Sequence, residues 1–370
     1  MSDLSVNSIL DASGGATTTI NGFTPTVSNM AGRNRLINSD MRIDQRNAGA
    51  AVLAATLGTG TYIVDRWTTY FTQSAKFSAQ QNQGGATPPA GFTNYLGLTT
   101  ASAVSVGAGD TFFAYQVVEG FNIADLGWGT ANAQTITVSF WARSNLTGAF
   151  GASITNAGVR NYAFSYNIPT ANTWTYVTAT IPGDTGGSYT TGNGSGFQLR
   201  FNLGSGSSFQ STANTWSTSN TVAPTGSVSV VGTSGATFYI TGVQLEAGSV
   251  ATPFERRQYG QELALCQRYY ETVGAGMNGS ATSATTVSLS ARYAVAKRAV
   301  PTLVGLTTTP AILSDGVGYI SGTASAYAFS AVITNNVAGF GVQINGFSGM
   351  TNNGGIMCNQ SKLISASAEL

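Results

Sequence analysis

Apolar and polar residues alternate with a period of two through the middle of the chain, and this pattern constrains the fold most. It runs through "QTITVSFWARS" at 134–144, "NYAFSYNI" at 161–168 and "GFQLRFNLG" at 196–204. A period of two with one apolar face is typical of half-buried antiparallel strands. We predict at least eight such strands between about residues 60 and 250, which favours an all-β fold, an antiparallel jelly-roll sandwich.

The segment "TFYITGVQLE" at 237–246 closes this series with one irregularity. Phe238 and Ile240 share a face, and the apolar positions then move to Val243 and Leu245. A slip of one residue at Gly242 predicts a β-bulge, in which one strand carries an extra residue.

The period changes after residue 250, where charged residues gather. Thr252, Pro253 and Glu255 have the spacing of a capping box, which predicts a short linking helix over 253–271. Beyond it, alternation returns in segments such as "AGFGVQING" at 338–346. The predicted divisions are an N-terminal arm of weak patterning (1–47), a jelly roll (48–252), a helical linker (253–272) and a smaller C-terminal β domain (273–370).

The chain carries few charges, since 16 Lys and Arg face 15 Asp and Glu for a net charge of +1. Proteins that bind nucleic acid or membrane surfaces show basic stripes, and the longest basic run here is Arg256-Arg257. No apolar run reaches the roughly 18 residues of a spanning helix, and the N-terminus lacks a signal-peptide pattern. We expect no nucleic-acid partner, no membrane insertion and synthesis in a cytoplasm.

Histidine is absent, which removes the commonest general base and most zinc sites. Cys266 and Cys358 are too few for a disulfide framework or a cysteine-bound metal. The carboxylates are dispersed, and Asp40 and Asp44 lie among arginines, where structural pairing is the more frequent role. We expect no catalytic site, no metal and no cofactor.

Aromatic and polar side chains on the strands are the remaining candidates for a binding surface. Rings that stack on sugar faces, beside amide and guanidinium donors, are suited to glycans. The alternative is that these rings pack against a neighbouring subunit or the N-terminal arm. The candidate glycan-binding residues are Trp141, Trp174, Tyr176, Gln198, Arg200, Asn202 and Trp216.

Three segments carry a resemblance to a known family. "TFYITGVQLEAGSVATPFERRQYGQELALCQRYYE" at 237–271 resembles a segment of bacteriophage tail-fibre and receptor-binding proteins. "NRLINSDMRIDQRNAGA" at 34–50, followed by "YIVDRW", resembles the opening of the same proteins, with Ser39 in place of a small Gly. The final "ISASAEL" resembles their usual ending. The resemblance implies a carbohydrate-binding-module-like jelly roll, a helix and a β tip domain.

The resemblance also implies a role and an assembly. It implies a homotrimer in the virion, whose N-terminal arm binds a phage tail or baseplate protein and which recognises a host surface glycan without catalysis. In calcium-binding jelly-roll modules the last strand often carries an Asp that binds the ion. This chain has Thr241-Gly242 there, so the resemblance does not extend to that calcium ligand. Alternatives are a structural virion adaptor or decoration protein and, less favoured, a glycan-degrading tailspike. The helix stripe that would pack around a threefold axis, or beneath its own sandwich, is Tyr259, Leu263, Cys266 and Tyr270.

Overall fold

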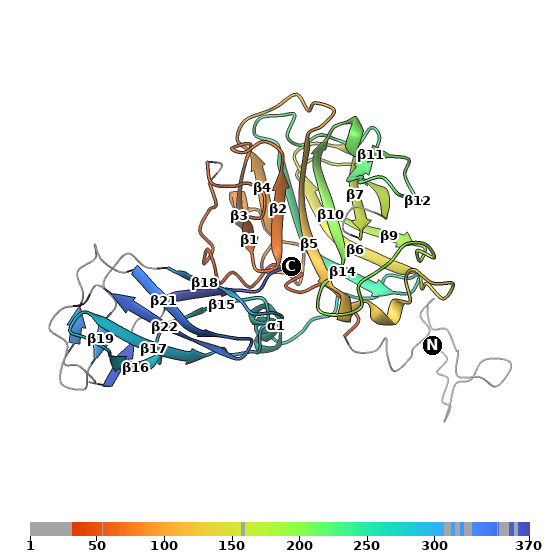
Figure 1. The fold of residues 1–370 in the computed structure, drawn as a ribbon. Helices are drawn as coiled ribbons and strands as arrows, with labels where there is room; N and C mark the ends of the chain where they lie inside the picture. Colours follow the sequence, from red (N-terminus) through yellow and green to blue (C-terminus); the bar gives the residue numbers. More distant parts are fainter. Residues whose placement is uncertain are drawn as a thin grey trace, which may run out of the picture. The chain divides into compact units, whose positions relative to one another are not determined.

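Figure 1 shows the chain as a computed structural model, with strands as its dominant element. The structure describes residues 32–53, 55–156, 160–306, 312–314, 319–321, 328–345, 347, 355–358 and 362–370. The chain divides into two compact units. Of the described residues, the first unit holds 32–42 and 49–256, and the second holds 43–48 and those beyond 256.

Two antiparallel sheets form the first unit, one of seven strands in the order β1-β2-β5-β10-β7-β8-β12 and one of five in the order β3-β4-β14-β6-β9. The strands of the seven-stranded sheet are β1 (Tyr62–Val64), β2 (Trp67–Phe71), β5 (Thr111–Glu119), β7 (Gly148–Thr155), β8 (Asn161–Ile168), β10 (Ser195–Ser205) and β12 (Thr215–Ser217). Those of the five-stranded sheet are β3 (Phe77–Gln81), β4 (Leu96–Thr100), β6 (Ile136–Ser144), β9 (Thr175–Ile181) and β14 (Thr237–Ala247). A short parallel pair joins β11 (Gln210–Ser211) to β13 (Ala223–Pro224).

The hydrophobic core of the first unit lies between the two sheets. Phe201 of β10 contacts Phe140 of β6 and Phe238 of β14, with ring centroids 5.0 and 6.2 Å apart, and all three side chains are fully buried. Burying each such ring contributes about 1.5–3 kcal/mol to stability. The alternation predicted for these strands is therefore confirmed, and with it the all-β sandwich.

The predicted β-bulge at Gly242 is also confirmed. Thr241 pairs with Trp141, and Gln244 pairs with Ser139, so β14 has one more residue than β6 between these two pairs. Gly242 has a φ of 61°, a left-handed conformation that glycine adopts readily. The ring of Phe92 lies where a Cβ at this position would stand.

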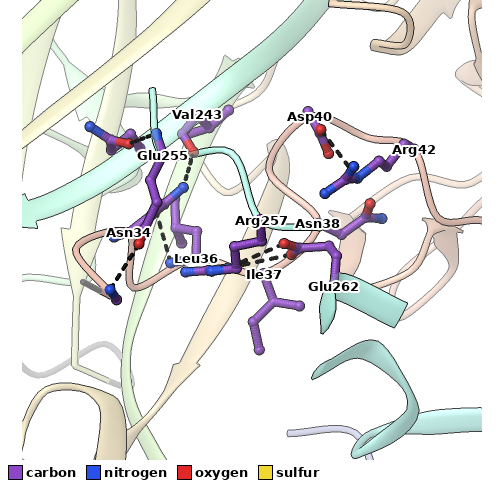
Figure 2. A network of polar contacts seen from close by, with 12 residues as sticks. Asn34, Leu36, Ile37, Asn38, Asp40, Arg42, Val243, Glu255, Arg257 and Glu262 are labelled. Atoms are coloured by element: carbon purple, nitrogen blue, oxygen red, sulfur yellow. Dashed lines mark hydrogen bonds and ion pairs between the residues drawn. The ribbon is translucent and has the colours of Figure 1, made fainter. Parts of the chain in front are cut away.

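Residues 32–42 pack into the first unit, which corrects the predicted arm of 1–47. Leu36 and Met41 are fully buried in its core. The side chain of Asn34 donates to the carbonyl of Val243 at 3.0 Å (Figure 2). It also accepts from the amide of Leu245 at 3.1 Å. These apolar residues reach the core from turns, so they follow neither strand nor helix spacing. The remainder of the predicted arm, residues 1–31, lies outside the described residues.

The segment 43–48 belongs to the second unit instead. Arg46 forms an ion pair with Glu369 at 2.9 Å, and its guanidinium lies 3.6 Å from the ring centroid of Tyr270. The side chain of Gln45 donates to the carbonyl of Tyr270 at 2.8 Å. This part of the predicted arm is therefore also packed.

The predicted capping box is wrong. Thr252 donates through its amide and its hydroxyl to the buried carboxylate of Glu246, at 2.9 and 2.6 Å. Glu255 accepts from the amides of Gly32 and Asn34, at 2.8 and 2.7 Å. Neither residue caps the helix: Thr252 binds a carboxylate on β14, and Glu255 binds backbone amides more than 200 residues away.

The helix is shorter than predicted. It is α1 (Tyr259–Gln267), it lacks a side-chain cap, and β15 (Tyr270–Val273) follows where helix was expected. The predicted stripe is therefore divided, because Tyr270 lies on the strand. Tyr259 is 57% exposed, Leu263 is half-buried and Cys266 is fully buried. Glu262 is buried beside Arg257, and their charged atoms are 3.4 Å apart.

The second unit is antiparallel β structure, as predicted. Its sheets have the orders β15-β24-β18 and β20-β19-β23-β16-β17-β22-β21. Its remaining strands are β16 (Asn278–Ala281), β17 (Thr286–Arg292), β18 (Thr302–Gly305), β19 (Ile312–Ser314), β20 (Tyr319–Ser321), β21 (Ala328–Asn335), β22 (Gly339–Asn345), β23 (Gly355–Cys358) and β24 (Ile364–Ser367). A separate core includes the fully buried Val287, Val342 and Cys358. Cys266 and Cys358 are both buried, and no disulfide joins them.

Candidate functional site

The outer face of the seven-stranded sheet gathers aromatic and polar side chains from three neighbouring strands. Since Leu199 and Phe201 of β10 point into the core, Gln198 and Arg200 point away from it. Arg200 pairs with Tyr115 of β5, and Phe113 of β5 pairs with Tyr70 of β2. The register thus places these side chains beside one another (the strands β2, β5 and β10 in Figure 1).

These side chains line a hollow of about 360 Å³, which we name the Arg200 hollow. Its wall is completed by the segment between β10 and β13. The lining residues are Thr59, Tyr70, Thr111, Phe113, Tyr115, Gln198, Arg200, Phe209, Asn220 and Val222. The lining contains a single formal charge, the guanidinium, and no carboxylate.

Neighbouring polar groups hold the guanidinium of Arg200 in place. Its Nε donates to Oε1 of Gln198 at 3.0 Å, and its Nη1 donates to Oδ1 of Asn220 at 2.9 Å. The guanidinium lies 4.8 Å from the ring centroid of Phe113. Burial lowers the pKa of Arg200 to about 10, and the neighbouring hydroxyls of Tyr115 and Tyr70 oppose that shift. Arg200 remains a cation at neutral pH.

Three rings form the apolar part of the hollow. Tyr70 stacks on Phe113 with centroids 5.2 Å apart and planes inclined by 12°, and Phe113 lies 5.3 Å from Tyr115. Phe113 is buried, whereas Tyr70 is 39% exposed. A partly exposed ring beside fixed donors can stack on the apolar face of a sugar while its hydroxyls take hydrogen bonds. The arrangement is suited to binding rather than to acid–base chemistry.

A second hollow of about 330 Å³ lies on the outer face of the five-stranded sheet, and we name it the Trp141 hollow. Trp141 of β6 pairs with Tyr176 of β9, and their rings are 5.2 Å apart. The guanidinium of Arg256 lies over the ring of Phe92, 4.6 Å from its centroid. The lining residues are Phe92, Ser139, Trp141, Tyr176, Gly242, Pro253, Phe254 and Arg256.

The sequence candidates therefore divide between two faces. Gln198 and Arg200 line the first hollow, and Trp141 and Tyr176 line the second. The structure does not bring these two pairs together, because they lie on different sheets.

The other three candidates line neither hollow and hold the fold together. The indole of Trp174 donates to the carbonyl of Thr87 at 2.7 Å, and that of Trp216 donates to the carbonyl of Pro182 at 2.9 Å. Asn202 is buried, and its side chain accepts from the amide of Gly204 at 3.2 Å.

Sequence reasoning missed the aromatic half of the Arg200 hollow. Tyr70 lies in "TYIVDRWTTYF", where the alternation about Trp67 marks it as outward-facing. Phe113 and Tyr115 lie in "TFFAYQVVE", an almost continuous apolar run whose two faces cannot be told apart by pattern. Asn220 comes from an irregular segment and carries no sequence signal.

Among the described residues, His, Cys, Asp and Glu side chains form no group of three or more that could hold a metal ion. No described helix is both long enough and apolar enough to cross a bilayer.

Comparisons with known proteins give no family assignment. No family model matches the chain, and no curated protein matches it. Among solved structures, the enzymatically active domain of bacteriophage CBA120 tailspike protein 4 matches 53% of this chain at 14% identity with a TM-score of 0.28. This chain covers only 21% of that structure.

Two carbohydrate-binding modules are also similar to part of the chain. TmCBM61, solved with β-1,4-galactotriose, matches 58% of this chain and 99% of its own at 11% identity and a TM-score of 0.28. A family 11 module from Clostridium thermocellum, solved with a mixed-linked tetrasaccharide, matches 51% and 92% at 11% identity and a TM-score of 0.27. Similarity this low says nothing of the ligand of the present chain.

Proposed function

We propose that the first unit is a non-catalytic glycan-binding module and that the Arg200 hollow is its binding site. The observation that carries this proposal is the half-exposed ring of Tyr70 beside the fixed guanidinium of Arg200. The ring offers a stacking surface, and the guanidinium and the side chain of Asn220 offer directed hydrogen bonds. The lining lacks a carboxylate, so it offers no pair for glycoside hydrolysis.

We further propose that the module belongs to a phage tail fibre or receptor-binding protein that recognises a host surface glycan as part of the virion. Support comes from the resemblance of the segments 34–50, 237–271 and 364–370 to that family. The same resemblance supports a homotrimer attached to the tail through its N-terminal residues. Three linked copies would raise the avidity of a weak glycan site, which adsorption to a cell surface requires.

Binding of the full-length protein to a microbial glycan array tests the ligand class. Tyr70→Ala should weaken binding about 2- to 12-fold, because a ring contact is worth about 0.5–1.5 kcal/mol. Tyr176→Ala is the matched control, since it removes an exposed tyrosine from the Trp141 hollow. A larger loss with Tyr176→Ala would move the site to the other sheet, and absence of binding to any glycan would reject the function.

Two further measurements test the finer proposal. Sedimentation at micromolar concentration should give the mass of a trimer, and a monomer would contradict the assembly. Incubation with the bound glycan should release no oligosaccharide, and release would contradict the non-catalytic role. A protein that is trimeric but does not adsorb to bacteria would favour the structural adaptor instead.

A further inference from the structure

Arg200 is a buried cation whose described surroundings contain no counterion. Its side chain and backbone together are only 6% exposed, and its hydrogen bonds go to two neutral amide oxygens. Taking a cation out of water costs several kcal/mol, and an opposite charge offsets most of that cost. Amide oxygens and the ring of Phe113 offset it only in part.

Two other cations in the protein have a carboxylate partner. Arg160 forms an ion pair with Asp184 through Nε at 2.8 Å and through Nη2. The ammonium of Lys297, fully buried, lies 3.2 Å from the carboxylate of Glu271. Each of these cations has a carboxylate from its own chain, whereas the one at the base of the Arg200 hollow has none among the described residues.

The free donors of Arg200 are open to the hollow. A guanidinium has five N–H donors, and the two hydrogen bonds to Gln198 and Asn220 leave three of them, including both on Nη2. Nη2 forms no hydrogen bond with the described residues, and it is not fully buried, so solvent reaches it. The hydroxyl of Tyr70 lies close enough to act on the charge of Arg200, and it can donate to an anion.

The geometry points to a carboxylate-bearing sugar as the ligand of the Arg200 hollow, with Nη2 of Arg200 as its anchor and Tyr70 as its stacking surface. Charge-assisted hydrogen bonds from arginine to a carboxylate are about twice as strong as neutral ones, and the planar guanidinium matches the carboxylate. The inference rests on the proposed function and adds the class of sugar, an acidic one such as a uronic acid residue.

The Trp141 hollow is the weaker candidate for such a ligand. Arg256 is exposed there, and the negative charge of Asp40 already acts within its reach. Burial raises the pKa of Asp40, and the charges of Arg42 and Arg256 oppose this shift. An arriving carboxylate would therefore meet the negative charge of Asp40 near Arg256, whereas the lining of the Arg200 hollow contains no carboxylate.

The test uses acidic glycans that the protein binds on the array. Each is compared with the same glycan after its carboxyl groups are reduced to primary alcohols. The full-length protein should bind the acidic form at least tenfold more tightly, because a hydrogen bond to a charged group is worth about 1.5–3 kcal/mol. Equal binding of both forms, or preference for neutral glycans, would overturn the inference and leave the proposed function standing. Absence of all glycan binding would reject the proposed function itself. Preference for sulfated or phosphorylated glycans over carboxylated ones would also overturn the inference.

Substitutions then locate the anchor. Arg200→Gln should remove most of the preference for the acidic form, and Arg200→Lys should retain part of it. Arg256→Gln is the matched control, because it removes the same charge from the other hollow. Thermal unfolding of each variant verifies the fold. A preference that survives Arg200→Gln, or that disappears with Arg256→Gln, would contradict the assignment.

Discussion

Asp184 is the carboxylate whose loss should destabilise the first unit most clearly. It is 1% exposed and accepts hydrogen bonds from Nε of Arg160 at 2.8 Å, from the hydroxyl of Tyr189 at 2.7 Å and from the amide of Gly186 at 3.1 Å. Nη2 of Arg160 is a further donor to it. Asp184→Asn keeps the size of the side chain, removes the charge and turns an N–H₂ group toward donors.

The magnitude follows from these contacts. Asp184 is buried, but the side chain of Arg160 is 19% exposed, so loss of the carboxylate should cost about 3 kcal/mol, the lower end of the range for a buried ion pair. Burial acts to raise the pKa of Asp184, but the hydrogen bonds from Arg160, Tyr189 and Gly186 outweigh it, so its pKa is lowered. A lowered pKa stabilises the fold above the unfolded value near 3.9, and that contribution is lost as pH falls through the folded value. The difference between variant and parent should therefore be full at pH 7 and shrink below about pH 4.

Urea unfolding followed by tryptophan fluorescence measures this difference in the intact chain. All five tryptophans lie between residues 67 and 216, so the signal reports on the first unit. Asp125→Asn is the matched control, since Asp125 pairs with Arg35 at 2.6 Å but its side chain is 47% exposed. Exposed pairs contribute up to about 1 kcal/mol. An equal effect of the two substitutions, or a loss below about 1 kcal/mol for Asp184→Asn, would refute the reasoning.

Three further substitutions test other parts of the fold. Gly242→Ala should lower the free energy of unfolding by about 1–3 kcal/mol, because φ is 61° and the new Cβ would stand 2.5 Å from Cζ of Phe92; an unchanged urea midpoint would contradict this. Leu36→Ala should lower the free energy of unfolding by about 2–5 kcal/mol in the same assay. An unchanged free energy would show that residues 32–42 do not pack into the core and belong to an N-terminal arm. Glu271→Gln should cost about 3–5 kcal/mol in the second unit by circular dichroism, whereas replacing Glu271 by Leu together with Lys297 by Met should recover most of it. Failure of the double variant to recover would show that the pair acts through more than its charges.

Local pattern predicted some elements well and others poorly. The alternation of β10 was sufficient to place Gln198 and Arg200 on one outward face, because a strand repeats every two residues whatever its neighbours are. The bulge at Gly242 was visible for the same reason. The predicted capping box at Thr252 was wrong, because the spacing of a local motif cannot show that a buried carboxylate from β14 binds that threonine.

The candidate site was also predicted only in part from the sequence. Aromatic residues alone did not separate a binding surface from packing, and Trp174 and Trp216 bond to carbonyl groups far along the chain. Tyr70 and Arg200 lie 130 positions apart in the numbering, and only the pairing of β2, β5 and β10 makes them neighbours. Sequence reasoning therefore named the guanidinium of the hollow and missed its rings.

The sequence by itself determined the all-β class, the inward set of core residues and the outward position of Arg200, because each depends on a spacing of two within one strand. Tertiary structure decided what Arg200 meets. The order and register of the sheets set Phe113 beneath its guanidinium and Asn220 beside it, and they leave it without a carboxylate among the described residues. These are contacts between segments far apart in the chain, and their geometry is fixed by the packing of the whole sandwich rather than by any local preference.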